Sequence, residues 1–161
     1  MTEKLRVIPL GGLGEIGKNM MVFELGEDLI IVDAGLMFPE EEMLGVDLVI
    51  PDVSYVAERI AKLRGILITH GHEDHTGALP YVLPQLQLPN GKLPPIYCTR
   101  LTHGLISVKL QEHKLANRAD LRMVQTGDSV RLGKFNAEFV RVTHSIPDSA
   151  GIIIRTPVGN V

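Results

Sequence analysis

The sequence predicts an α/β fold that is rich in β-strands, and three observations lead to this prediction. A chain of 161 residues with 45% hydrophobic and 22% charged residues is typical of one soluble domain, or of a piece of one. Short runs of β-branched residues recur between glycine, proline, asparagine and aspartate. Three stretches with helical spacing of apolar residues separate some of these runs. We therefore expect a sheet with flanking helices.

Nine runs are predicted to be strands, and they cover residues 5–10, 19–26, 28–35, 65–70, 94–99, 120–125, 129–133, 135–144 and 150–156. The residues PVGN that follow the last run are typical of a hairpin turn, with the returning strand beginning at Val161. A strand without its partner would leave backbone groups unpaired, so we expect the chain to be a fragment of a longer protein.

Three helices are predicted between the strands. The first covers residues 53–61 and follows Asp52, a suitable capping residue. A shorter helix begins near Thr76, because Pro80 is tolerated only in a first turn. The last lies in residues 101–115, where Leu101, Leu105, Val108 and Leu115 form an approximate apolar face. The acidic stretch between residues 36 and 52 is predicted to be a solvated loop.

Charge and cysteine content exclude some classes of protein. The net charge of −3 gives no overall attraction to nucleic acid or to an anionic membrane, so a polyanionic substrate would need local charge or metal ions. No apolar run approaches the roughly 20 residues that cross a bilayer. The single Cys98 cannot form an internal disulfide, and residues 1–20 do not resemble a secretion signal. We expect a cytoplasmic protein.

The residues GLGEIG spell the G-x-G-x-x-G pattern of dinucleotide-binding folds. Such folds need a helix directly after the glycines, because the pyrophosphate binds to its N-terminal N–H groups. Here residues 18–25 are typical of a strand, and a turn and another strand follow. The glycines therefore indicate a sharply turning backbone between two strands.

The strongest chemical signal is the segment THGHEDHTG, which directly follows an apolar strand. It contains His70, His72, Asp74 and His75 in the pattern H-x-H-x-D-H. Imidazole and carboxylate are ligands that zinc-type metals prefer, and a loop lets these residues converge on two neighbouring metal positions. The alternative is an exposed polar loop in which Asp74 or Thr76 only caps a helix. The concentration of imidazole favours the metal site.

This motif resembles the signature of the metallo-β-lactamase fold superfamily. The stretches VIPLGGLGEIGKN, IIVDAGLMFPEEEMLGVDLVIPD, ITHGHEDHTGALPY and THSIPDS are similar to the bacterial ribonuclease J family of its β-CASP branch, in the same order and over essentially the whole chain. The resemblance implies an αββα sandwich with a mixed, mostly antiparallel sheet. Residues 1–161 would form its N-terminal part, without the β-CASP insertion and the C-terminal domain.

The resemblance also implies a set of ligands. His70 and His72 would hold one metal ion together with His144, which taken alone would more often be a structural residue. Asp74 and His75 would contribute to a second ion. The family's bridging aspartate and last histidine would lie beyond the chain, so we expect fewer than two ions here. Zn²⁺ is expected, with Mn²⁺ as the alternative.

Further roles follow from the same resemblance. Asp33 would orient the ligand loop without binding metal, and Asp74 and His75 would be the catalytic pair. A loop on the substrate side of the site would be formed by Gly12, Gly14, Glu15, Gly17 and Asn19.

The implied function is that of a metal-dependent ribonuclease in RNA processing and decay, with 5′-3′ exonuclease activity, endonuclease activity or both. It would act on 5′-monophosphorylated RNA as a homo-oligomer, without a membrane partner. Two alternatives stay open: another hydrolase of this fold, acting on a thioester, a lactam or a small phosphodiester, and a catalytically silent folding or binding unit. His103 and His113 are predicted to be surface or packing residues, and Cys98 a buried one.

Overall fold

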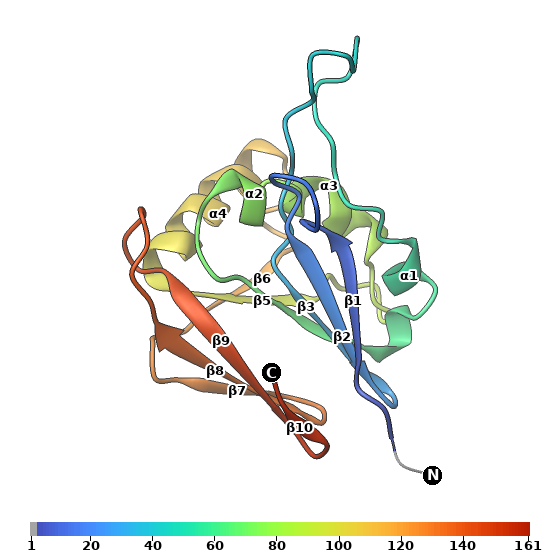
Figure 1. Ribbon diagram of the computed structural model, residues 1–161, viewed down its shortest axis with the longest axis vertical. Coiled ribbons are helices and arrows are strands. Elements are labelled where there is room, and N and C mark those ends of the chain that lie inside the picture. Colours follow the sequence, from blue (N-terminus) through green and yellow to red (C-terminus); the bar gives the residue numbers. More distant parts are fainter. Residues whose placement is uncertain (1–2) are drawn as a thin grey trace.

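Two sheets and one layer of short helices make up the fold (Figure 1). The computed structural model describes residues 3–161. The larger sheet has six strands in sequence order: β1 (Arg6–Gly11), β2 (Met20–Leu25), β3 (Asp28–Val32), β4 (Leu63–Leu67), β5 (Pro95–Cys98) and β6 (Asp120–Met123). The first three strands are antiparallel to their neighbours, whereas β3 to β6 are parallel. The predicted mixed sheet is therefore confirmed.

The smaller sheet is antiparallel, with the order β10-β9-β8-β7. Its strands are β7 (Ser129–Leu132), β8 (Phe135–Arg141), β9 (Ala150–Thr156) and β10 (Gly159–Asn160). The predicted hairpin after β9 is present, but its returning strand begins at Gly159 and not at Val161. Thr156 pairs with Gly159 across a two-residue turn, so pairing starts earlier than the sequence pattern indicated.

The helices are shorter than predicted: α1 (Ser54–Ala57), η1 (Ile60–Lys62), α2 (Glu73–Thr76), α3 (Leu79–Val82), η2 (Leu83–Gln85) and α4 (Arg100–Glu112). The predicted helix 53–61 is only a single turn followed by a 3₁₀ turn, although the Asp52 carboxylate does accept the N–H of Ser54 at 2.8 Å. Pro80 lies in the first turn of α3, as predicted. None of the helices in residues 3–161 is long and apolar enough to cross a membrane.

The packed face of α4 differs from the prediction. Thr102, Ile106 and Leu110 are buried, whereas the predicted Leu101 and Leu105 are 39% and 41% exposed. This helix carries apolar residues on more than one face, and spacing alone does not say which face meets the sheet.

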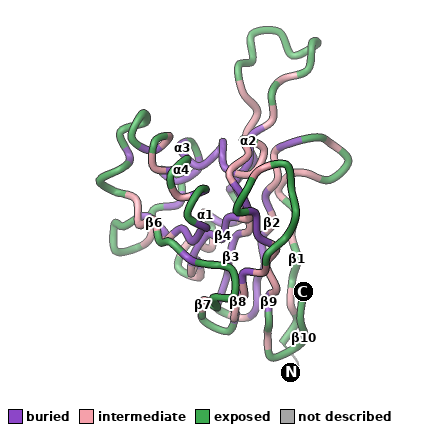
Figure 2. The backbone as a smooth tube through the Cα atoms, turned by 90° about the vertical axis from the view of Figure 1, so that its left-hand side faces the viewer, coloured by how far each residue is buried: buried purple, intermediate pink, exposed green. Residues whose placement is uncertain are grey.

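Two apolar cores hold the layers together. On β3, Leu29 and Ile31 face the helices, and Ile30 faces the smaller sheet, so both faces of this central strand are buried (Figure 2). Six buried side chains of the helices belong to the core on the helical side and none to the other core: Val56, Leu79, Val82, Leu83, Ile106 and Leu110. Within residues 3–161 we therefore find three of the four layers of the expected sandwich, and no helix covers the outer face of the smaller sheet.

Residues 38–48 project from the body as a long, mostly exposed excursion between β3 and α1 (Figures 1 and 2). A single bridge between Met37 and Val49 closes its base. This agrees with the solvated loop that the breakers Pro39 and Gly45 predict.

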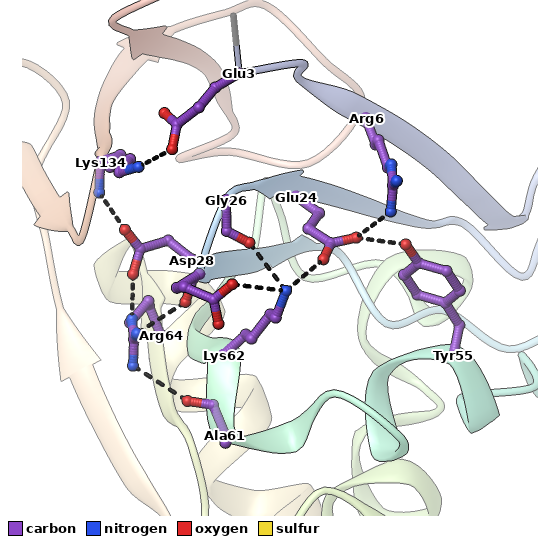
Figure 3. Close-up of polar contacts among 11 residues, drawn as sticks. Glu3, Arg6, Glu24, Gly26, Asp28, Tyr55, Ala61, Lys62, Arg64 and Lys134 are labelled. Atoms are coloured by element: carbon purple, nitrogen blue, oxygen red, sulfur yellow. Dashed lines mark hydrogen bonds and ion pairs between the residues drawn. The ribbon is translucent and has the colours of Figure 1, made fainter. Parts of the chain in front are cut away.

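Charged residues join the two sheets at the amino end of β3 (Figure 3). The carboxylate of Asp28 accepts hydrogen bonds from Arg64 Nε at 2.5 Å and from the backbone N–H of Lys134 at 2.9 Å. Lys134 lies between β7 and β8, so this contact joins the sheets at the end of β3 away from Asp33. Nearby, buried Glu24 accepts a hydrogen bond from the Tyr55 hydroxyl.

Candidate metal centre

The H-x-H-x-D-H motif lies within residues 69–77, which comprise the loop after β4 and the helix α2 and are called the ligand loop below. Because β3 and β4 are parallel and pair up to Val32 and Leu67, the segments that follow them meet at one edge of the sheet. The segment between β8 and β9 reaches the same edge, where the N–H of Ala150 donates to the carbonyl of Thr69 at 2.9 Å. Three segments far apart in the sequence therefore converge here.

Three histidines form a group that could hold a metal ion. One ring nitrogen from each of His70, His72 and His144 lies within 4.8 Å of the others. Nε2 of His70 is 3.1 Å from Nδ1 of His72. The ring centroid of His144 is 4.4 Å from that of His70 and 5.0 Å from that of His72. This is a suitable donor set for a zinc-type ion.

The protonation of His70 suits this role. Burial lowers the pKa of His70 to about 4, and the nearby His75 contributes to the decrease. Metals bind the neutral form of imidazole. His70 therefore offers a lone pair at neutral pH without first losing a proton.

Asp33 orients His75. One carboxylate oxygen of Asp33 is 2.7 Å from Nδ1 of His75, and the other accepts the backbone N–H of Thr69 at 2.8 Å. Burial lowers the pKa of His75, but the hydrogen bond and negative charge of Asp33 outweigh it, so the pKa is raised overall. With Nδ1 held by the carboxylate, Nε2 is the nitrogen directed toward Asp74.

The side chain of Asn19 lies against the second half of the motif. Its Nδ2 donates to the Asp74 carbonyl at 3.0 Å and to Asp74 Oδ2 at 3.2 Å, and lies 3.2 Å from His75 Nε2. The last two atoms are themselves 3.4 Å apart. The amide nitrogen of Asn19 thus contacts both the Asp74 carboxylate and the His75 imidazole, at a point where a cation could contact them. Together with the three histidines, this carboxylate and imidazole form a ligand set that fits divalent metals of the zinc type.

Gly35 allows the ligand loop to pack directly on the end of β3. A Cβ atom at this position would lie 1.6 Å from the Asp74 carbonyl oxygen. Backbone hydrogen bonds on either side join Ala34 N to His75 O at 2.8 Å and Gly35 N to Asn19 O at 2.9 Å. The motif DAG therefore supplies the orienting carboxylate and, two residues later, the space that the ligand loop needs.

Comparison with known proteins agrees with this geometry. The sequence pattern of the Metallo-beta-lactamase superfamily matches residues 13–149. The chain belongs to this superfamily. The matched region contains the ligand loop, Asp33 and His144, which the structure brings together at one edge of the larger sheet.

Within the superfamily, the chain is similar to proteins named ribonuclease J. It is 45% identical to Ribonuclease J of Thermus thermophilus, and the aligned region covers 99% of this chain and 28% of that protein. It is 42% identical to Ribonuclease J2 of Bacillus subtilis over the same shares. The chain thus spans about 28% of the length of these relatives.

Solved structures show the same fold at low sequence identity. A protein of unknown function from Enterococcus faecalis superposes with a TM-score of 0.68 at 18% identity, covering 98% of this chain and 42% of that protein. Zn²⁺-bound PqqB from Methylobacterium extorquens superposes with a TM-score of 0.60 at 11% identity, covering 89% and 47%. These likenesses concern the fold alone.

The glycine-rich loop connects β1 directly to β2, and both strands pair in a hairpin. No helix follows the glycines, so the predicted turning backbone between two strands is confirmed. The Glu15 carboxylate accepts the N–H of Gly12 at 3.0 Å and pairs with Lys18 at 3.2 Å. Asn19, the last residue of the expected substrate-side loop, contacts Asp74.

Sequence reasoning missed the role of Asp148. This residue has a positive φ of 64°, and its Oδ2 accepts the N–H of Leu101 in the first turn of α4 at 2.9 Å. Its carbonyl accepts the Thr99 hydroxyl at 2.8 Å. The segment that carries His144 is therefore attached to the start of α4. The only available signal was the position of Asp148 in THSIPDS.

Three further predictions are confirmed. His103 is half-buried on α4, and its carbonyl accepts the Ser107 hydroxyl. His113 is exposed, and its ring lies 5.3 Å from that of Tyr81. Neither residue belongs to the histidine group. Cys98 is buried.

Proposed function

We propose that the natural protein is a metal-dependent ribonuclease that hydrolyses RNA phosphodiester bonds, as an exonuclease, an endonuclease or both. The main support for this proposal is that His70, His72 and His144 lie together beside the Asp74–His75 pair. The similarity to proteins named ribonuclease J over 99% of the chain supports the choice of RNA as substrate.

The proposed metal ligands are those of the sequence analysis. His70, His72 and His144 hold one ion, and Asp74 and His75 contribute to a second. Zn²⁺ is the favoured ion and Mn²⁺ the alternative. When bound, two such ions neutralise charge on a phosphodiester and lower the pKa of a water molecule toward neutrality.

The protein residues around these ions have separate tasks. Asp33 fixes the ring of His75 through Nδ1. Asp74 orients the attacking water, and together with His75 it forms the proposed catalytic pair. The loop with Gly12, Gly14, Glu15, Gly17 and Asn19 forms the proposed substrate-side wall, because part of it borders a groove shared with Asp74.

The remaining parts of the proposal concern the complete protein. Its relatives are more than three times as long as the chain. We propose that the missing ligands are a bridging aspartate just after the next strand and a last histidine that follows a β-CASP insertion, and that the natural protein also has a C-terminal domain. The substrate is 5′-monophosphorylated RNA, the setting is cytoplasmic, and the full-length protein is a homo-oligomer.

Cleavage by the full-length protein tests this function. Labelled 5′-monophosphorylated single-stranded RNA is compared with a thioester, a lactam and a small phosphodiester. We expect RNA to be the preferred substrate, and His72→Ala and Asp74→Ala to reduce its cleavage at least about 100-fold while remaining folded. The matched control His113→Ala should cleave RNA at the wild-type rate. Wild-type turnover in either site variant would refute the site, and preference for another substrate would refute the function.

Metal content tests the 161-residue chain by itself. Five candidate ligands predict fewer than two tightly bound ions per chain, measured by elemental analysis after dialysis. Two tightly held ions in a monomeric preparation would contradict this prediction. A chain that binds no ion and cuts no RNA would be the silent folding or binding unit.

A further inference from the structure

A row of inward-facing residues on β8 ends in an arginine at the metal edge. Phe135, Ala137 and Phe139 are buried between the two sheets. Arg141 is the next residue with the same orientation, and it pairs with buried Ala150 on β9. Its charged side chain therefore leaves the sandwich at the rim where Ala150 contacts the ligand loop.

A cavity of about 350 Å³ lies at this rim. Its lining includes Arg141 and the candidate ligand His144, together with the hydroxyl-bearing Thr126 and Thr143. The guanidinium and these two hydroxyls have no hydrogen-bond or ion-pair partner within residues 3–161. A molecule in the cavity would thus meet three uncommitted donor groups beside the metal centre.

The carboxylate that borders this cavity is already engaged. Asp148 directs Oδ2 to the N–H of Leu101 at the start of α4, and the hydroxyl of Ser149 donates to the Ile146 carbonyl. Asp148 keeps its negative charge, but no carboxylate of the described residues forms an ion pair with Arg141. A planar guanidinium with neighbouring hydroxyls suits a phosphate group.

The surface on the Asp74 side of the ligand loop is acidic, whereas the cavity beside His144 includes Arg141. A groove of about 650 Å³ there is bordered by four carboxylates, those of Glu15, Glu40, Glu73 and Asp74. Glu15 pairs with Lys18 and Glu73 with Lys109, whereas Glu40 and Asp74 have no lysine or arginine partner in the described residues. The two sides of the candidate metal centre thus differ in charge, and of the two linings only the one on the His144 side includes an arginine that could contact a phosphate.

We propose that Arg141, Thr126 and Thr143 form a subsite for one backbone phosphate next to the bond that is cut. This inference rests on the proposed ribonuclease function and adds the direction from which the RNA backbone reaches the metals. Arg141 supplies the charge and a forked pair of donors, and the threonine hydroxyls complete the contact.

The test compares Arg141→Gln with Arg131→Gln in the full-length protein. Arg131 lies on β7 and borders a different cavity, so its substitution removes the same charge away from the site. We expect Arg141→Gln to raise KM for single-stranded RNA about fivefold to tenfold with little change in kcat. Arg131→Gln should keep the wild-type KM, and unchanged zinc content will show that the metal centre of Arg141→Gln is intact.

A salt titration of RNA binding separates this subsite from the cleavage function. Fluorescence anisotropy with the same RNA in chelator should give a plot of log K against log salt whose slope is about 0.7 smaller for Arg141→Gln, because one phosphate contact is lost. Arg141→Lys should keep the wild-type slope, since it retains the charge.

Each outcome is decisive. A wild-type slope and a wild-type KM in Arg141→Gln would overturn the subsite while leaving the ribonuclease function intact. A wild-type protein that binds RNA without cutting it would refute the function, and the salt slope would still decide the subsite. A protein that does neither would refute both.

Discussion

Substitution of Gly35 by alanine should separate the ligand loop from the sheet. The added Cβ would lie 1.6 Å from the Asp74 carbonyl oxygen, whereas real Cβ contacts essentially never fall below 3.0 Å. The loop and the end of β3 must therefore move apart by about 1.4 Å. This movement acts on backbone atoms, so no side-chain rotation relieves it.

The expected cost follows from the contacts that this movement breaks. Backbone hydrogen bonds across the junction include Asn19 N to Asp74 O and Ala34 N to His75 O, and each lost bond costs about 1 kcal/mol. Overpacking adds about 1–3 kcal/mol. We expect the free energy of unfolding to fall by about 3–5 kcal/mol, which lowers the melting temperature by about 6–20 °C for a domain of this size. Displaced ligands should weaken metal binding about 10–100-fold.

Calorimetry and a zinc competition titration measure the two effects. Gly104→Ala is the matched control, because nothing lies within 4 Å of a Cβ at that position in α4. Alanine stabilises a helix interior by about 1 kcal/mol relative to glycine, so this control should melt higher and bind metal normally. If Gly35→Ala kept the wild-type melting temperature and zinc affinity, the proposed contact between β3 and the ligand loop would be wrong.

Three further predictions concern stability and reactivity. Asp28→Ala should lower the free energy of unfolding by about 3 kcal/mol in urea titrations, because the buried Asp28 carboxylate accepts hydrogen bonds from Arg64 and from the backbone of Lys134. Asp120→Ala, from an exposed ion pair, should cost less than about 1 kcal/mol, and equal losses would contradict the role of Asp28 in joining the two sheets. With metal removed by a chelator, the melting temperature should fall as the pH decreases from about 6.5 toward 4. The reason is that His70 takes up a proton near its ordinary pKa of 6.5 in the unfolded chain, but only near a pKa of about 4 in the folded chain. The raised pKa of His75 acts in the opposite direction, so the difference between wild type and His70→Gln isolates this effect, and parallel pH profiles would refute it. Burial raises the pKa of Cys98 to about 12, so a thiol reagent at pH 8 should modify it only after unfolding; rapid modification of the native protein would show that the thiol is accessible.

The sequence predicted the ligand loop because its chemistry is local. His70, His72, Asp74 and His75 lie within six residues, and the apolar residues 66–68 before them are fully buried. The position of His144 beside these residues depends on how the two sheets pack against each other. No local pattern in the sequence encodes that packing, so only the family resemblance indicated His144 as a ligand.

Other features escaped prediction for physical reasons. The strand predicted to continue to residue 35 ends at Val32, because Asp33 adopts a left-handed conformation with a φ of 61°. The close approach of Gly35 to Asp74 is a contact between segments 39 positions apart, and it leaves no periodic signal. Likewise, the face of α4 that is buried depends on how the helix packs on the sheet, which the spacing of its apolar residues does not specify.

The position of His144 in the segment that joins β8 to β9 has a mechanical consequence. An ion shared by His70 and His144 would cross-link the two sheets at one rim, while Asp28 and Lys134 link them at the other. Without the ion, the metal rim keeps the hydrogen bonds from Ala150 to Thr69 and from Thr99 and Leu101 to Asp148, but it loses the cross-link through the histidines. Removal of metal should therefore speed hydrogen exchange of the backbone amides near the first residues of β9, and change exchange near Lys134 less.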